Sequence, residues 1–407
     1  MPIDTSQWKP LSFGRFTLLA PPDATSVGTY WLWTDLIERS KDITSMELLK
    51  QAVAAKQAEF KSQKHVDFGN RYINSYDLKG KGVSVWGYKR GEINDLNNLH
   101  CATVYAYYYA ADPFKVWTVK RTFSMGGGAE KRELDYELKL AQSIRPLKEG
   151  EVPKGYGFVM DGGMVASDEY QGEQAEFSYW TPAWSNPPPN PDGNGFGGLT
   201  ITTTAPARAT EDTFFQRLDK EHTALKALLS SGKELRRREL VINGIAGQEY
   251  LFRTAPVRSD WTEYHFKWAA NGKVEDNYRP DISVTFEMHT PSYHALPPPP
   301  FQSDEDAIAF WDAALGTLQL RPVTASDGRQ VAQSGEVVPQ ITCGSEMRVP
   351  KTGLYKGTID PAHPNANYYN SSNFFVFKQE GETMGRLGAY GSEHQVTWTW
   401  IRATREV

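Results

Sequence analysis

The stretch AFWDAALGTLQLRP (residues 309–322) has a weaker echo in ELKLAQSIRP (residues 137–146). Each is an amphipathic run typical of a helix, and each closes on an apolar residue followed by Arg-Pro. In and just before the later stretch, apolar residues recur at helical spacing at Ile308, Trp311, Leu315 and Leu318. Because proline ends a helix, Pro146 and Pro322 indicate that the two predicted helices end in the same way. We interpret the two stretches as the closing helices of two related domains.

The N-terminal half shows one order of elements before its closing helix. The run FGRFTLLAPP (residues 13–22) predicts a strand, and Thr44 with Glu47 is a capping-box signature for a helix that reaches about residue 61. Its predicted inward residues are Met46, Leu49, Val53 and Phe60. Four runs rich in β-branched and aromatic residues follow as predicted strands. The closing helix is predicted over about 131–143, with Leu134, Leu138, Ala141 and Ile144 inward.

The C-terminal half repeats this order with extra strands and a long inserted loop. Thr210 predicts the cap of a helix whose inward residues are Phe214, Leu218, His222, Leu225 and Leu229. Residues 234–256 predict two strands, with turn signals near their junction at Asn243-Gly244 and Ala246-Gly247. Ser303, three residues before Asp306, predicts the start of the closing helix.

We therefore predict an α+β fold of two tandem related domains with mainly antiparallel sheets, followed by a small all-β appendage. The predicted boundaries are 1–146, 147–325 and 326–407. A polar linker after about residue 323, followed by short strand-like runs with Gly, Pro and Asn turns, indicates the appendage. Cys101 and Cys343 fall in different predicted domains, so two isolated thiols or one inter-domain disulfide are the alternatives.

Composition narrows the classes of function. With 40% hydrophobic and 13% aromatic residues, the 407-residue chain can build packed cores. A net charge of -5 without long like-charged blocks disfavours nucleic acid as a partner. No apolar run approaches the ~20 residues that cross a bilayer, so we expect no direct membrane insertion. The first residues carry no export signal, which is consistent with a cytoplasmic protein or with a mature exported chain.

The chain shows no pattern of residues typical of an enzyme. It contains no HExxH, GxSxG or P-loop motif. Gly193, Gly195 and Gly198 spell GxGxxG, but no strand precedes them and no helix follows, so we predict no cofactor. His289 and His294 could ligate a metal with Glu287, yet no spacing rule favours this, and we predict neither a metal site nor catalytic residues.

Segments expected on the surface are more distinctive than any catalytic pattern. The loop YWTPAWSNPPPNPDGNGFGG (residues 179–198) combines aromatic residues with many prolines and glycines, and long loops of this kind are usually functional or disordered. The predicted partner-binding residues are Trp180, Trp184 and Phe196 of this loop and the acidic Asp168, Glu169 and Glu173. The alternatives are a Pro-rich insertion that packs on its own domain, a solvated acidic face, and an acid–base pair of Glu173 with Glu176.

Three segments carry a family resemblance. They are a Gly-Phe-x-x-x-Gly-Gly start (Gly157, Phe158, Gly162, Gly163), a Gly-x-x-Gly-Gln-Glu segment (Gly244, Gly247, Gln248, Glu249) and a Trp-Asp…Arg-Pro ending (Trp311, Asp312, Arg321, Pro322). Over residues 150–322 the chain resembles the C-terminal domain of the type VI secretion immunity proteins that neutralise phospholipase effectors. These motif residues are of structural types: turn glycines, core aromatics and a helix end.

The resemblance implies a function that the residues alone do not show. Such a protein has two α+β domains and binds a lipase effector of the α/β-hydrolase type, 1:1, so that the lipase cannot act. It resides in the periplasm, where the effector attacks membrane lipid during bacterial competition. Two alternatives stay open: a chaperone or adaptor that binds a secreted lipase without inhibiting it, and a hydrolase that uses Glu173 and Glu176.

Overall fold

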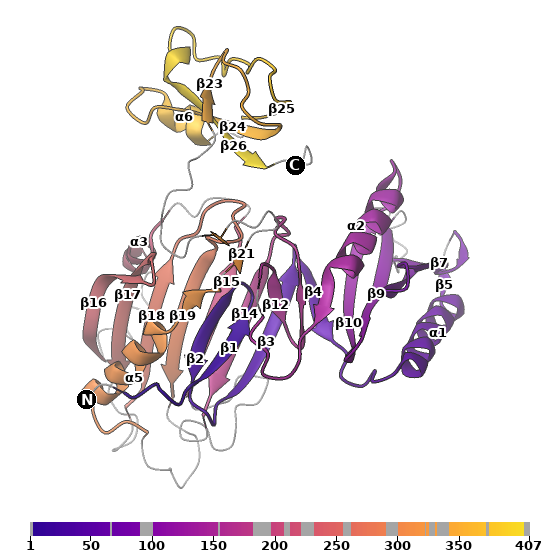
Figure 1. Cartoon of the computed structure of the whole chain (residues 1–407), viewed down its shortest axis with the longest axis horizontal. Helices are drawn as coiled ribbons and strands as arrows, with labels where there is room; N and C mark the ends of the chain where they lie inside the picture. The colour runs from indigo at the N-terminus through magenta and orange to yellow at the C-terminus, as the bar shows by residue number, and fades with distance from the viewer. Residues whose placement is uncertain are drawn as a thin grey trace. The chain divides into compact units, whose positions relative to one another are not determined.

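The computed structural model of the chain forms two compact units, residues 1–334 and 335–407 (Figure 1). It describes residues 3–402 except 66, 90–100, 154, 182–196, 207–211, 221–231, 255–261, 290–299, 322, 325–329, 332–341 and 372–373. Every strand pair among the described residues is antiparallel. The predicted α+β class with mainly antiparallel sheets is confirmed.

A twelve-stranded sheet runs through the first unit and contains strands from both predicted domains. In spatial order its strands are β16 (Gly232–Ile242), β17 (Ile245–Thr254), β18 (Tyr264–Ala270), β19 (Asp281–Met288), β15 (Gly197–Thr204), β14 (Gln174–Trp180), β3 (Thr25–Leu32), β4 (Asp35–Arg39), β10 (Phe114–Ser124), β9 (Cys101–Ala111), β8 (Gly82–Tyr88) and β7 (Tyr72–Asp77). β3 joins the two halves, because its Trp31 lies opposite Gln174 of β14. The division of this unit at residue 146 stays a prediction.

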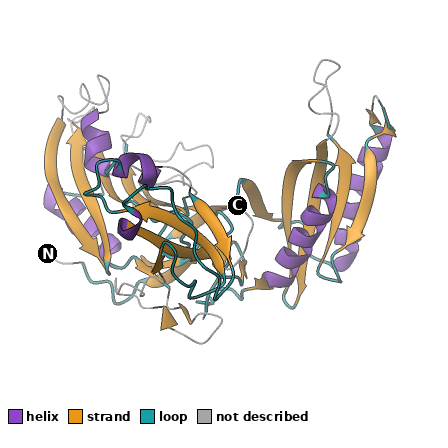
Figure 2. Ribbon diagram, turned by 90° about the horizontal axis from the view of Figure 1, so that it is seen from above, coloured by secondary structure: helices purple, strands orange, loops and turns teal. Residues whose placement is uncertain are grey.

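A helix covers each face of the sheet at β7–β10 (Figure 2). They are α1 (Met46–Ser62) and α2 (Ala129–Ser143). Side chains alternate between the faces of a strand, so Tyr108 of β9 packs in the same core as Leu140 of α2, whereas Tyr107 packs with Phe60 of α1. This part of the sheet is therefore buried on both sides.

At the opposite end of the sheet, α5 (Asp304–Gly316) packs against β18 and β19. The Ser303 hydroxyl accepts a hydrogen bond from the backbone N–H of Asp306 at 3.1 Å, which confirms the predicted start of this helix. The ring of Trp311, fully buried, lies 5.9 Å from that of Phe266. On α3 (Phe214–Lys220), which also lies in this half, Phe214 is buried as predicted. The predicted Thr210, His222, Leu225 and Leu229 lie outside the described residues.

Two predictions for the N-terminal half are wrong in detail. The cap of α1 is Ser45 and not Thr44, since the Ser45 side chain accepts from the N–H of Leu48. The single strand predicted over residues 13–22 is part of a hairpin of two strands. These are β1 (Lys9–Phe13) and β2 (Phe16–Ala20), which turn at Gly14 with a φ of +49°.

The inward faces of α1 and α2 also differ from prediction. Leu49, Val53 and Phe60 of α1 are buried as expected, but Met46 is 37% exposed. On α2 the buried residues are Glu137, Leu140 and Ala141, with Leu134 and Leu138 only partly buried. The prediction for α2 relied on an apolar pattern, and the carboxylate of Glu137 on its buried face interrupts that pattern.

Small sheets complete the first unit. β20 (Gln319–Leu320) adds to the β1–β2 hairpin, and β11 (Ile144–Pro146), β13 (Gly163–Val165) and β12 (Phe158–Met160) form another sheet. The remaining pairs are β5 (Lys64–His65) with β6 (Gly69–Asn70) and β21 (Val323–Thr324) with β22 (Gln330–Val331). Because Phe16 pairs with Leu320, the start of the chain lies beside the end of its closing helix.

The second unit is a four-stranded sheet with its own core. Its strands are β23 (Thr342–Gly344), β26 (Val396–Arg402), β24 (Gly353–Ile359) and β25 (Phe375–Lys378). Tyr355 and Trp398 are buried in that core. The predicted β appendage also contains the short helix α6 (Ala366–Ser371) and the 3-10 turn η2 (Glu393–Gln395). Cys343 is a free thiol buried in this unit, and Cys101 lies on β9 of the first unit.

Candidate functional site

The acidic residues predicted to bind a partner lie on the segment that joins β13 to β14. Glu169 is exposed, and its carboxylate pairs with Lys139 of α2. Asp168 is half-buried. The backbone carbonyls of both residues accept hydrogen bonds from Nδ2 of Asn277, at 3.4 Å for Asp168 and 2.8 Å for Glu169. This contact holds the segment against the fold while the Glu169 side chain faces solvent.

Glu173 is not on that surface. Its side chain is 5% exposed, and its two carboxylate oxygens accept hydrogen bonds from Nε and Nη2 of Arg15 at 2.7 and 2.6 Å. Burial raises the pKa of the Glu173 carboxyl, and Arg15 opposes that shift. Because both oxygens are used inside the fold, we correct the prediction of Glu173 as a partner contact. Glu176, its suggested acid–base partner, is exposed on β14.

Trp180, the described one of the three predicted aromatic residues, does not join the acidic residues in a single patch. Trp180 ends β14 and packs, partly buried, on the core of the first unit. β14 begins only after the acidic segment, so Trp180 lies about 20 Å from Gln174 at ~3.3 Å per residue of strand. Trp184 and Phe196 lie outside the described residues.

An exposed tryptophan that the sequence did not reveal lies beside the acidic segment. Trp33, between β3 and β4, is 46% exposed and has a φ of +58°. The Trp33 ring meets Tyr170 edge to face, with centroids 5.3 Å apart, and the backbone N–H of Trp33 donates to the backbone carbonyl of Gln171 at 2.7 Å. We call Trp33, Asp168, Glu169 and Tyr170 the Trp33 surface. It is an aromatic anchor with a polar rim, as in many protein interfaces.

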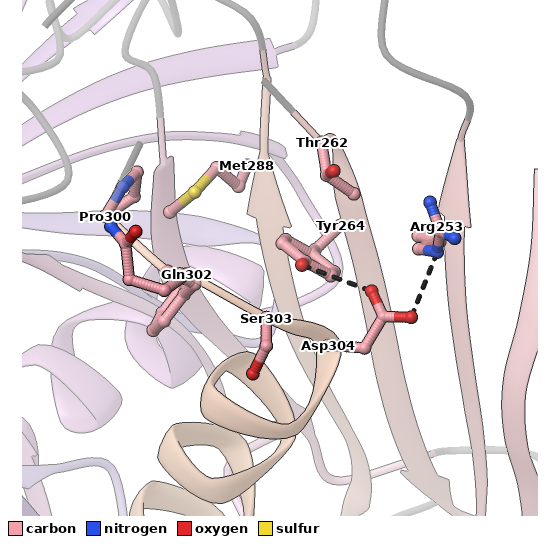
Figure 3. A pocket seen from close by; sticks show the side chains of 9 residues that line it. Arg253, Thr262, Tyr264, Met288, Pro300, Gln302, Ser303 and Asp304 are labelled. Carbon is pink, nitrogen blue, oxygen red and sulfur yellow. Dashed lines mark hydrogen bonds and ion pairs between the residues drawn. The ribbon is translucent and has the colours of Figure 1, made fainter. Parts of the chain in front are cut away.

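A cavity of about 410 Å³ lies at the N-terminus of α5 (Figure 3). There Asp304 accepts a hydrogen bond from Tyr264 at 3.3 Å and pairs with Arg253 at 3.1 Å. Burial raises the pKa of Tyr264 to about 12. Ser303 uses its hydroxyl to cap the helix. These partners give Arg253, Tyr264, Ser303 and Asp304 structural roles.

The first family motif lies where the β1–β2 turn meets the residues that follow α5. Gly157 has a φ of +132°, and a Cβ there would lie 2.5 Å from the carbonyl oxygen of Val165. Its carbonyl accepts a hydrogen bond from Nη2 of Arg321, which also donates to Gly14 at 3.2 Å. Arg321 is 1% exposed; burial and the nearby Arg15 lower its pKa to about 10. The motif is structural, as its residue types predicted.

The second and third motifs contact each other. Glu249, fully buried on β17, accepts hydrogen bonds from Nε1 of Trp311 at 2.8 Å and from Nε of Arg236 at 2.6 Å. Arg236 also reaches Asp312 through Nη1 at 2.9 Å. Gly247 lies against Trp268, since a Cβ there would come within 2.6 Å of its indole. These contacts fasten α5 to the β16–β17 hairpin.

The three motifs lie within a segment that matches a known protein family. Residues 151–323 match the family described as "Tle cognate immunity protein 4 C-terminal domain". The resemblance inferred over residues 150–322 is thus confirmed for this segment, which includes all three motifs. No curated protein sequence matches the chain.

Solved immunity proteins have a similar fold. The apo immunity protein TplEi of the type VI secretion system of Pseudomonas aeruginosa is 23% identical, with a TM-score of 0.67. The match covers 79% of this chain and 99% of TplEi. A chain of the Tle4–Tli4 complex is also 23% identical, with a TM-score of 0.68 over 79% of this chain and 100% of its own. Among the described residues, no helix is long and apolar enough to span a membrane.

Proposed function

We propose that this protein is an immunity protein of type VI secretion that binds a cognate lipase effector in the periplasm and inhibits it. The observation that carries the proposal is the family match over residues 151–323 within a fold that extends across almost the whole length of solved immunity proteins. One of those structures is a complex named Tle4–Tli4. A non-enzymatic role agrees with Glu173, whose carboxylate is engaged by buried Arg15.

We further propose the Trp33 surface as part of the contact with the lipase. A half-exposed tryptophan can bury a large apolar area at low entropic cost, and tryptophan is enriched among hot-spot residues. The exposed carboxylate of Glu169, paired with Lys139 of α2, lies on the same segment as Tyr170, so this ion pair adds a polar rim to the aromatic contact.

Co-expression tests the proposal. The full chain is produced with the lipase encoded beside it, and the two are purified through an affinity tag on the lipase alone. We expect a stable 1:1 complex with no phospholipid hydrolysis. A complex that still hydrolyses phospholipid would favour the adaptor alternative, and a lipase that elutes alone would contradict the proposal.

A further inference from the structure

Four titratable side chains share one face of the β18–β19 pair. In the antiparallel register His265 lies opposite Glu287, and Tyr264 lies opposite Met288. Since residues two apart on a strand point the same way, Glu263 and His265 on one strand face the same side as Glu287 and His289 on the other. The intervening Tyr264 and Met288 are buried in the core that contains α5.

Three of these residues converge as metal ligands do. One ligand atom from each of Glu263, His265 and His289 lies within 4.8 Å of the other two. The imidazole centroids of His265 and His289 are 5.4 Å apart. Around Zn²⁺, bonds of about 2.0–2.1 Å in tetrahedral geometry bring neighbouring ligand atoms to about 3.4 Å. Small side-chain rotations would therefore close the group around an ion.

The surroundings provide the support that metal ligands usually have. Nε2 of His289 lies 3.5 Å from a carboxylate oxygen of Glu287, and Thr254 donates to Glu263 at 3.3 Å. Carboxylates and hydroxyls that contact the ligands in this way orient them in protein metal sites. The ring of Phe252 lies 6.3 Å from that of His265 and forms an apolar wall.

We propose that Glu263, His265 and His289 bind one divalent transition-metal ion of the Zn²⁺ type. Two imidazoles and one carboxylate suit Zn²⁺ and later first-row ions better than Ca²⁺ or Mg²⁺. Three protein ligands leave a fourth position for water or for a side chain of a partner. This set shares His289 with the alternative considered from the sequence, but Glu263 and His265 take the places of Glu287 and of His294, which lies outside the described residues.

Zinc titration of the untagged full chain, against a chromophoric chelator at pH 7.5, tests the site. We expect one Zn²⁺ per chain in the wild type and an affinity at least tenfold lower in His289→Gln and Glu263→Gln. His394→Gln is the matched control, because it removes an exposed imidazole from the second unit. It should bind Zn²⁺ as the wild type does.

Two outcomes would overturn the proposal: a wild type without saturable Zn²⁺ binding, or equal affinities in His289→Gln and the His394→Gln control. Since His289 is exposed, its replacement should leave the fold intact, which circular dichroism checks. X-ray absorption of the loaded protein gives a second measurement. Nitrogen and oxygen neighbours at about 2.0–2.2 Å with imidazole scattering support the site, and a shell of oxygen alone would contradict it.

Discussion

The buried pair of Arg15 and Glu173 leads to a stability prediction at the scale of single residues. Replacing Glu173 by Gln leaves the Arg15 guanidinium buried without its counter-charge. Because breaking a buried ion pair costs about 3–5 kcal/mol, we expect E173Q to lower the free energy of unfolding by that amount in a urea titration. E176Q changes a nearby exposed residue, on β14, and should stay within about 0.5 kcal/mol of wild type. Equal values for the two variants would contradict the prediction.

The buried carboxyl of Glu137 should make the stability of the fold depend on pH. Burial raises its pKa to about 7, whereas a free glutamate titrates near about 4.3. Between these values the folded protein holds a proton that the unfolded chain has released, so stability falls as the pH rises through this window and then levels off. Gln cannot ionise, so the free energy of unfolding of E137Q should rise relative to that of wild type as the pH rises, by up to about 4 kcal/mol above pH 8.

Chemical unfolding of E137Q and wild type at pH 5, 6, 7 and 8 measures that gain. A difference that stays constant across the four pH values would mean that Glu137 does not titrate in this range. E133Q on the same helix is a useful comparison, because Glu133 pairs with Arg121 of β10 at 2.8 Å. Burial raises the pKa of the Glu133 carboxyl too, so the difference in stability between E133Q and wild type should shift with pH in the same direction as that of E137Q.

Replacing Trp33 should affect binding of the lipase and not folding. If the Trp33 surface contacts the lipase, W33A should raise the dissociation constant roughly 30-fold, the value for a hot spot of about 2 kcal/mol. Surface plasmon resonance against the immobilised lipase measures this. Tyr390, fully exposed in the second unit, gives the control Y390A, for which we expect no change. Equal dissociation constants for W33A and Y390A would exclude Trp33 from the contact.

At the scale of elements, Asn243 joins the β16–β17 hairpin to α5. It lies in the turn at a φ of +46°, and its Nδ2 donates to the carbonyls of Gly316 at 3.0 Å and Leu318 at 2.8 Å, just beyond the helix end. N243A should lose both hydrogen bonds and cost about 1–3 kcal/mol of unfolding free energy. N243G loses them but tolerates positive φ, so it should fall between N243A and wild type in thermal unfolding. A variant N243A as stable as wild type would show that this contact is dispensable.

Elements with a local signal could be predicted from the sequence. The cap at Ser303 and the Asn243-Gly244 turn are both present, because each depends on neighbouring residues alone. The two Arg-Pro echoes looked alike, yet Arg321 is buried against Gly157, whereas Arg145 is 38% exposed and pairs with Glu151. What surrounds each arginine is decided by distant segments, which a local pattern does not contain.

At the scale of the whole molecule, the continuous sheet escaped prediction for the same reason. β3 and β4 were not foreseen, although they connect the two halves through β14 and β10. Pairing between strands far apart in the chain depends on packing that single-strand patterns do not specify. The same holds for the candidate site. Glu169 was proposed from the acidic pattern of its own segment, whereas Trp33 could not be proposed, because only the fold places it beside Tyr170.

Inhibition of the lipase is the central claim, and a titration of activity tests it most directly. Purified full chain is added stepwise to the neighbouring-gene lipase, and phospholipid hydrolysis in vesicles is followed. We predict that activity falls linearly and reaches the uncatalysed background at one equivalent, because tight 1:1 binding consumes the enzyme stoichiometrically. Full hydrolysis at several equivalents, with complex formation verified in the same sample, would contradict the account.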